Sequence, residues 1–277
     1  MVEIGKTSIL PVIRQVDFGY YLDGDDLGEI LIPKRYVPEK CKEGDELEVF
    51  IYLDSEDRLI ATTEIPYVEV GKSAHLKVVS EGKFGAFLDW GLPKDLLVPF
   101  KEQRVPMLAG KSYTVFLYID STNRIAASSR LSSFLKEYDD ENKFIEEQQV
   151  TLQIVSRSNI GYKAIINDTH LGVIHNNCIL QPIEIGQTID GYIKKIRKDG
   201  LIDLTLIAAG QEATNSLTDN ILEFIKAEGG STNLTDKSSP EDIFMAFNIS
   251  KSRYKKALGK LYKERKIIID KDLITLL

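Results

Sequence analysis

The sequence predicts a multidomain, mainly β chain made of three small OB-type five-stranded β-barrels and an α+β winged helix at its C-terminal end. Three observations carry this prediction. Residues 5–63 lie over residues 71–129 without a gap and are identical at 18 of 59 positions, so one small domain occurs twice. A weaker third copy follows. Beyond residue 215 the apolar period changes from that of strands to that of helices.

The first two copies, predicted as barrels over residues 1–66 and 67–133, are rich in short strand signals. Leu47–Leu53 and Thr114–Ile119 are β-branched or aromatic segments bounded by turn-forming residues. Five such strands in so small a domain favour a closed barrel of the OB type.

Residues 134–149 are acidic and lack Gly and Pro, which predicts a helical linker. The third barrel is predicted over residues 150–210, where Gly161 and Gly186 match Gly85 and Gly110 at an offset of 76. Its last part, Gly186–Leu206, alternates as two paired strands joined by a hairpin do.

Residues 215–277 carry the helical pattern. Thr218-Asp219, Ser239-Pro240 and Ser250 are predicted to begin three helices. The third helix places one apolar stripe, expected to be buried, at Tyr254, Ala257, Leu258, Leu261 and Tyr262. Ile267–Asp270 and Leu273–Leu277 are predicted strands around a turn at Lys271. Three helices followed by a β-hairpin form a winged helix, a variant of the helix-turn-helix.

Composition excludes several functional classes. No apolar run approaches a membrane span, and the N-terminal residues lack the features of a signal peptide. Cys41 and Cys178 form no pattern and indicate reduced thiols, so we expect a cytoplasmic protein. No catalytic, phosphate-binding or zinc motif occurs, and we expect no catalysis, cofactor, metal or small-molecule substrate. The acidic stretch Asp23–Glu29 could hold Mg²⁺, but a solvated loop is favoured.

Charge is distributed unevenly along the chain. The net charge of −7 argues against a nonspecific binder of polyanions. Counting Lys and Arg against Asp and Glu, residues 1–66 hold 7 against 15, whereas residues 67–134 hold 9 against 6. The second copy is therefore the better candidate for contact with phosphate.

One set of side chains recurs in both copies. In the second copy Phe84 and Phe87 flank a glycine that could form a bulge and place both rings on one face, and Asp120 and Arg124 bracket a turn. The first copy supplies the counterparts, which are Phe18, Tyr21, Asp54 and Arg58. Aromatic rings beside a guanidinium suit single-stranded nucleic acid, because bases stack on the rings and Arg pairs with phosphate.

This pattern resembles the RNA-binding domain named after the largest protein of the small ribosomal subunit, the S1 domain. The resemblance implies an RNA face made of the aromatic pair, a His twelve residues further on and the Asp/Arg pair. Pro33 and Pro99 stand at the His position in the first two copies. The third copy has His175 there, but Ile160 and Lys163 stand at its aromatic positions, and Ile196 and Gly200 at its Asp/Arg positions.

Three S1-like domains followed by a winged helix resemble the bacterial conserved virulence factor B family. The resemblance implies a cytoplasmic, RNA-binding protein that acts in post-transcriptional or transcriptional control of gene expression, with single-stranded RNA as its partner. The RNA-binding residues carried over are Phe84, Phe87, Asp120, Arg124, Phe18, Tyr21, Asp54, Arg58 and His175.

Each of these residues also has a plainer interpretation. The rings could belong to the barrel cores, each Asp/Arg pair could stabilise its own turn, and His175 could be a strand-end histidine. Trp90, which has no counterpart in the first copy, could cap the second barrel or add a stacking surface.

The predicted third helix of the winged helix is basic, with eight basic residues and one acid in residues 251–266. Arg253, Lys256, Lys260 and Lys263 lie opposite its apolar stripe. They could be a solvated face, contact the phosphates of RNA or of a double-stranded nucleic acid, or dock an acidic protein. The alternative to RNA binding is a scaffold with degenerate barrels that docks proteins of the ribosome or the transcription machinery.

Overall fold

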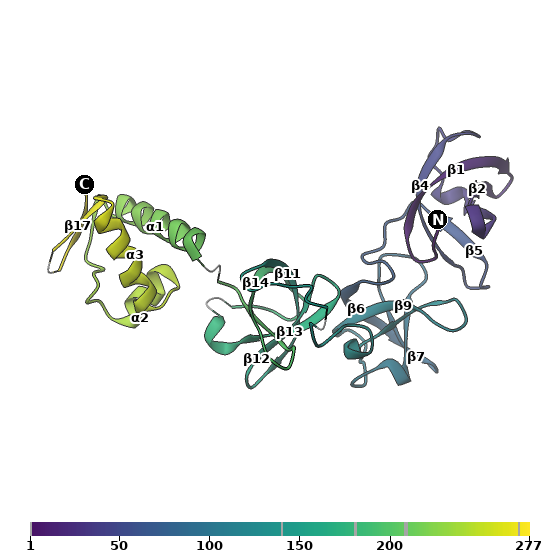
Figure 1. Cartoon of the computed structure of the whole chain (residues 1–277). Helices are drawn as coiled ribbons and strands as arrows, with labels where there is room; N and C mark the ends of the chain where they lie inside the picture. The colour runs from purple at the N-terminus through teal and green to yellow at the C-terminus, as the bar shows by residue number, and fades with distance from the viewer. Residues whose placement is uncertain (1, 140, 180–181, 208–209, 271) are drawn as a thin grey trace. The chain divides into compact units, whose positions relative to one another are not determined.

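The computed structural model describes residues 2–139, 141–179, 182–207, 210–270 and 272–277. The chain divides into two compact units. One comprises the residues up to Lys136 together with Asp168–His170, and the other comprises residues 137–167 and all residues from Leu171 onward. Figure 1 shows the strands and helices of the chain, coloured from the N-terminus to the C-terminus. The architecture confirms the predicted fold class, with three five-stranded β domains followed by a three-helix winged helix.

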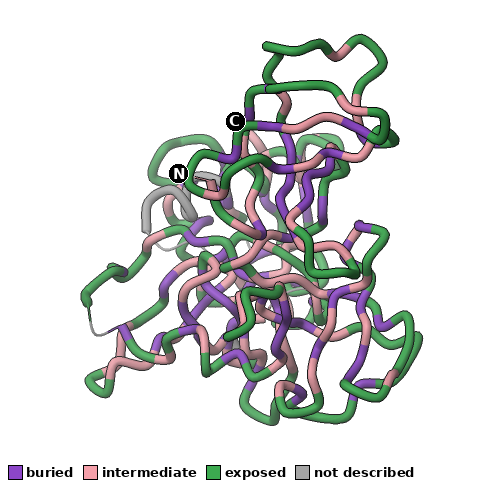
Figure 2. Tube along the Cα trace, turned by 90° about the vertical axis from the view of Figure 1, so that its right-hand side faces the viewer, coloured by how far each residue is buried: buried purple, intermediate pink, exposed green. Residues whose placement is uncertain are grey.

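The first barrel is closed, with the strand order β1-β2-β3-β5-β4. Its strands are β1 (Thr7–Val16), β2 (Gly19–Asp23), β3 (Glu29–Pro33), β4 (Glu46–Leu53) and β5 (Leu59–Thr62). Buried positions alternate with more exposed ones around Leu10 in β1 and along β3, whereas β4 is buried continuously over residues 49–52. The inward residues include Leu10, Leu22 and Ile30. Figure 2 shows how buried and exposed segments follow one another along the chain trace.

The second domain repeats this arrangement. Its strands are β6 (Ser73–Glu81), β7 (Gly85–Leu88), β8 (Leu96–Pro99), β9 (Ser112–Ile119) and β10 (Ile125–Ser128). They form a hydrogen-bonded sheet in the order β10-β9-β6-β7-β8, and its two outer strands, β8 and β10, lie against each other. We call this domain the second barrel.

The first two barrels share one hydrophobic cluster. Phe50, Tyr52 and Ile60 of the first barrel belong to the same buried cluster as the core of the second. The ring of Trp90 is 3% exposed and meets Phe50 edge-on at a centroid distance of 5.7 Å. Trp90 therefore packs against the neighbouring barrel, which resembles the predicted cap more than an open stacking surface.

The third barrel is closed, with the order β11-β12-β13-β15-β14. Its strands are β11 (Gln149–Ser158), β12 (Gly161–Ile166), β13 (His170–His175), β14 (Thr188–Ile196) and β15 (Ile202–Thr205). Short 3-10 helices cover Asp25–Leu27, Lys34–Tyr36, Phe100–Glu102, Leu131–Ser133 and Asn176–Cys178. Three of them directly follow the third strand of a barrel, so the repeat extends beyond the strands.

The predicted helical linker over residues 134–149 is wrong. Within residues 134–139 and 141–149 the structure contains no helix. Phe134 stacks on Phe116 of the second barrel, and residues 137–139 and 141–149 pack onto the third barrel. Tyr138 forms a β-bridge with Leu201, and the carboxylate of Asp139 accepts hydrogen bonds from the backbone N–H groups of Lys143 and Phe144. Phe144 is buried in the core of that barrel, and this packing overrides the helix propensity of the segment.

The winged helix contains α1 (Gly210–Ala227), β16 (Ser231–Thr232), α2 (Pro240–Phe247), α3 (Lys251–Lys263), β17 (Ile267–Ile269) and β18 (Ile274–Leu276). Its core joins Ile221, Ile225, Ile243 and Leu258 to the hairpin. Ser239 and Ser250 accept hydrogen bonds from the N–H groups three residues ahead, as predicted for N-caps.

Three details of the predicted winged helix need correction or lie outside the structure's description. Thr218-Asp219 does not begin a helix, because α1 already runs from Gly210 and Thr218 is buried within it. Tyr262 does not complete the buried stripe, because its side chain is 57% exposed. The predicted turn residue Lys271 lies outside the described residues.

Candidate nucleic-acid interface

The two rings of the second barrel lie outside its core. Along β7, Ala86 and Leu88 point inward and are fully buried, so alternation places Phe87, which is half-buried, on the outer side. Phe84, one residue ahead of the strand, is 73% exposed. The alternative that both rings are ordinary barrel core is therefore wrong.

Gly85 is required by a close approach of two strands. A side chain there would place its Cβ 2.0 Å from the carbonyl oxygen of Val98 on β8. The expected bulge does not lie at this glycine, because the register of β6 and β7 shifts between Val78 and Ser80 on the facing strand. Gly19 and Gly161 make the same close approach in the other two barrels, at 2.1 Å and 1.9 Å.

The matching rings of the first barrel lie in a different environment. Phe18 is 58% exposed, but the guanidinium of Arg14 lies over the ring of Tyr21, 4.1 Å from its centroid. Arg14 also forms an ion pair with Glu29 at 2.7 Å. In the second barrel the small residue Ser80 takes the place opposite Phe87, so its ring has no such cover from that position.

The Asp/Arg turns of the first two barrels have the same backbone. The N–H of Asp54 donates to the carbonyl of Arg58 at 2.9 Å, and that of Asp120 donates to Arg124 at 2.9 Å. Each carboxylate also accepts N–H groups of its own turn. Burial tends to raise the pKa of Asp54 and of Asp120. The hydrogen bonds from backbone N–H groups, joined by one from the Arg58 side chain at Asp54 and one from the Thr122 hydroxyl at Asp120, outweigh it and hold each pKa below its usual range.

The two arginines nevertheless have different partners. Arg58 folds back onto Asp54 at 2.8 Å and Glu56 at 3.0 Å, so the turn-stabilising alternative describes it. Arg124 forms its ion pair with Asp57, which belongs to the first barrel. The guanidinium predicted to serve the second barrel thus meets a carboxylate of its neighbour.

The third barrel builds a cluster around the predicted His175 from two residues that the sequence comparison missed, Arg197 and Asp203. Arg197 donates to both carboxylate oxygens of Asp203, at 2.9 Å and 2.6 Å. His175, at the end of β13, has its Nε2 atom 2.8 Å from Asp203 and 3.1 Å from Arg197. Burial tends to raise the pKa of Asp203, but the hydrogen bonds from Arg197 and His175 outweigh it and lower that pKa.

The offset of 76 residues that relates the second copy to the third does not hold from the end of β14 onward. The register of β14 shifts between Ile193 and Lys195, which adds one residue to the strand. The turn that corresponds to Asp54–Arg58 is closed by Arg197 and Leu201, whose backbone bond is 2.9 Å long, so Ile196 and Gly200 are not the matching positions. Allowing for one extra residue in β14 would have placed the first position of this turn at Arg197, one residue beyond Ile196.

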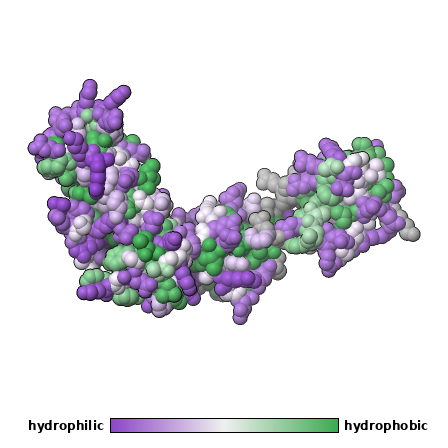
Figure 3. Space-filling model, turned by 180° about the vertical axis from the view of Figure 1, so that it is seen from behind, coloured by the Kyte–Doolittle hydropathy of each residue, from purple (hydrophilic) through white to green (hydrophobic). Residues whose placement is uncertain are grey.

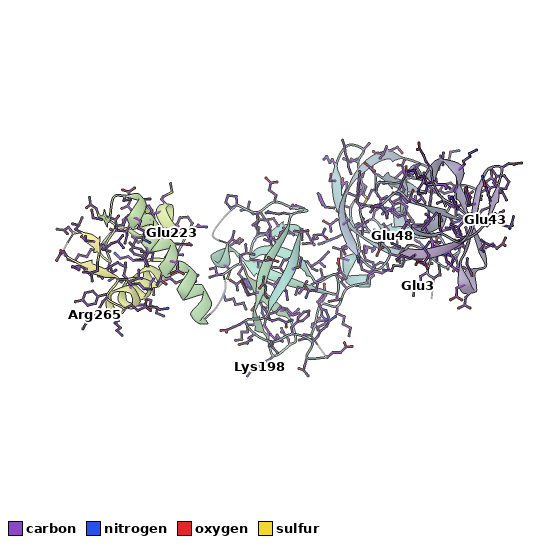
Figure 4. The ribbon with its side chains drawn as sticks, turned by 90° about the horizontal axis from the view of Figure 1, so that it is seen from above. Glu3, Glu43, Glu48, Lys198, Glu223 and Arg265 are labelled. Atoms are coloured by element: carbon purple, nitrogen blue, oxygen red, sulfur yellow. The ribbon has the colours of Figure 1, made fainter. Side chains whose placement is uncertain are left out.

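The basic residues of α3 lie on its outer side. Tyr254, Ala257, Leu258 and Leu261 are buried, whereas Lys256 and Lys263 are exposed and Arg253 and Lys260 are half-buried. Lys260 forms an ion pair with Glu264 at 3.8 Å. Arg265, just past the helix and labelled in Figure 4, is a further exposed basic residue.

Acidic side chains characterise the first barrel. Glu3, Glu43 and Glu48 are exposed there and labelled in Figure 4. Hydrophilic side chains cover much of the visible face of this barrel in Figure 3 (upper left). Among the described helices, none is long and apolar enough to cross a membrane.

Comparisons with known proteins agree with this architecture. The family model of the S1 domain matches residues 4–64 and 70–130, and that of the CvfB-like winged helix domain matches residues 219–276. The chain is thus a tandem S1-domain protein with a C-terminal winged helix, two domain types that bind nucleic acids. It belongs to the conserved virulence factor B family, as its resemblance to that family predicted.

Its relatives extend over nearly the whole chain. It is 31% identical to the uncharacterized protein YitL of Bacillus subtilis, over 95% of this chain and 90% of that protein. It is 26% identical to conserved virulence factor B of Staphylococcus epidermidis, over 99% and 94%. A crystal structure of a multidomain protein with nucleic acid binding domains from Streptococcus pneumoniae is 25% identical over 99% of this chain and 98% of that one, with a TM-score of 0.40.

Proposed function

We propose that this protein binds single-stranded RNA, with the second barrel as the principal platform, and that it acts as a non-catalytic regulator of gene expression in the cytoplasm. The observation that carries the proposal is the exposure of Phe84 together with the outward position of Phe87. Two rings outside a barrel core give bases a surface on which to stack. Asp120 fixes the turn that carries Arg124, whose guanidinium is the proposed contact for a phosphate.

The other modules add weaker contacts. In the first barrel Arg14 covers Tyr21, Arg58 is held by Asp54, and the surrounding acids repel phosphate. In the third barrel Arg197 is held by Asp203 beside His175, and the aromatic positions are Ile160 and Lys163, which offer no ring for stacking. The lysines and Arg253 of α3 contact phosphates without reading sequence. Weak modules on one chain raise the overall affinity through their effective concentration.

The test is the affinity of the full chain for a fluorescently labelled single-stranded RNA at low salt. The double variant Phe84→Ala/Phe87→Ala is expected to raise Kd by about thirtyfold or more, because it removes two rings and each stacked base contributes about 1–3 kcal/mol. The matched control Phe18→Ala/Tyr21→Ala changes the same positions of the first barrel and is expected to raise Kd by less than about threefold.

A salt series separates RNA binding from the scaffold alternative. Direct phosphate contacts make log K fall steeply with log salt, and Lys256→Ala/Lys263→Ala is expected to lower that slope by about 2. No RNA binding by the wild-type chain even at low salt would favour a protein scaffold. Unchanged binding by the folded Phe84/Phe87 double variant would remove the second barrel as the platform.

A further inference from the structure

A cavity of about 470 Å³ lies where the first two barrels meet, within the first compact unit. The first barrel lines it with Leu53, Ser55 and Asp57, and the second with Phe87, Lys94 and Arg124. Asp95 and Asp120 of the second barrel also line it, so five charged side chains stand on walls that are otherwise mostly apolar. A cavity of this size is typical of a site for a small organic group.

Several contacts hold the walls of this cavity together. Lys94 of the second barrel donates to the backbone carbonyls of Leu53 and Asp54 of the first, at 3.0 Å and 2.7 Å. The indole N–H of Trp90 donates to the carbonyl of Lys94 at 2.6 Å, and its ring packs on Phe50. These contacts tie the two walls of the cavity to each other.

The cavity brings together the two kinds of group that a nucleotide needs. Phe87 offers a ring for a base, and Arg124 offers a guanidinium for a phosphate. Neither residue lies in the core, so both are available at the opening between the barrels.

Arg124 is already engaged with a carboxylate of the first barrel. Its guanidinium forms an ion pair with Asp57, and the two side chains are 55% and 43% exposed. Ion pairs this exposed are weak, so a phosphate can replace the carboxylate. While Asp57 remains nearby, its charge repels that phosphate.

We propose that this junction cavity takes one nucleotide of the RNA strand, with its phosphate on Arg124, and that Asp57 of the first barrel competes with that phosphate. The inference rests on the proposed function and adds a role for the acidic first barrel. The pair of barrels then forms one binding site, in which the first copy restrains the second.

The substitution Asp57→Asn tests the competition without disturbing the turn. Asp57 has a φ of 61°, and its counterpart in the second barrel is Asn123, also at 61°, so Asn suits this left-handed position. For the full chain at low salt, we expect RNA affinity to rise about threefold, as an exposed ion pair allows, and the gain to shrink at high salt.

Glu56→Gln is the matched control, because Glu56 lies on the same turn but pairs with Arg58. It removes the same charge, and we expect a change in Kd of less than about 1.5-fold. An equal gain in both variants would show a general charge effect and overturn the competition. So would unchanged or weaker binding by Asp57→Asn.

Ser55→Trp tests the cavity itself. Ser55 is exposed on the turn, so a ring there fills the opening without entering either core, and thermal unfolding verifies the fold. We expect Kd to rise about fivefold or more, as for the loss of one stacked base. Wild-type affinity in this variant, alongside weaker binding by Phe84→Ala/Phe87→Ala, would overturn the cavity but leave the proposed function standing. Wild-type affinity in both would overturn the proposed function.

Discussion

Arg58 and Arg124 occupy the same position in two copies of one domain, yet they do different things. Both follow an Asp-led turn whose backbone hydrogen bonds agree in length. Arg58 pairs with Asp54 of its own turn, whereas Arg124 reaches Asp57 of the other barrel. The short Asp determines the turn in both copies, while the partner of the long Arg depends on what lies next to it.

Phe50 and Phe116 show the same contrast among apolar residues. Phe50 is 1% exposed and packs against Trp90 at the junction of the barrels. Phe116 is half-buried and stacks on Phe134, with the ring centroids 5.0 Å apart. Of these two equivalent rings, only Phe50 of the first barrel packs at the junction of the barrels.

The largest expected effect tests the junction. Phe50→Ala should lower the free energy of unfolding by about 3–5 kcal/mol, because a fully buried ring leaves a cavity. Phe116→Ala should cost about 1–2 kcal/mol, since its ring is only partly buried. Urea unfolding followed by the fluorescence of Trp90, the single tryptophan, measures both. Equal costs would mean that the junction adds nothing to the stability of the first two barrels.

A smaller effect is expected where the third barrel departs from the other two. Asp203→Ala should destabilise this barrel by about 1–3 kcal/mol, because Arg197 and His175 lose a shared charged acceptor. Hydrogen exchange of the barrel's amides in the full chain measures the loss. Asp190→Ala, an exposed carboxylate on β14, is the control and should be nearly neutral.

The same residue gives the third barrel a pH dependence of known sign. Folding lowers the pKa of Asp203, so its contribution is present above the pKa of an unfolded Asp, about 4, and is lost as pH falls through the lower folded value. Hydrogen exchange between pH 5 and pH 3 should show this decline in the wild-type chain and a weaker one in Asp203→Ala. An identical decline in both would contradict this assignment.

The smallest effects separate the two arginines. Arg58→Ala should lower stability by at most about 1 kcal/mol and leave RNA affinity nearly unchanged. Arg124→Ala should weaken RNA binding by about 1 kcal/mol and reduce the salt slope by about 1. Thermal unfolding and RNA titrations of both variants make the comparison. The reverse assignment of effects would show that the first barrel carries the phosphate contact.

Sequence patterns predicted correctly the features that depend on residues close together in the chain. The duplication, the strands, the N-caps of α2 and α3 and the equivalence of Phe84 with Phe18 all follow from spacing along the chain. The linker failed because the burial of Phe144 depends on a barrel that follows it in sequence. Arg197 was missed because one added residue in β14 displaces every later position. The partners of Trp90 and Arg124 come from another copy, which spacing within one copy does not reveal.

The hydrophobic cluster that the first two barrels share around Trp90 makes each copy of the duplicated domain depend on the other. A freshly doubled domain has two complete cores and can lose either copy. Here Phe50, Tyr52 and Ile60 are packed together with the core of the second barrel. Deleting either copy would expose apolar surface on the other, so the duplication has become difficult to reverse.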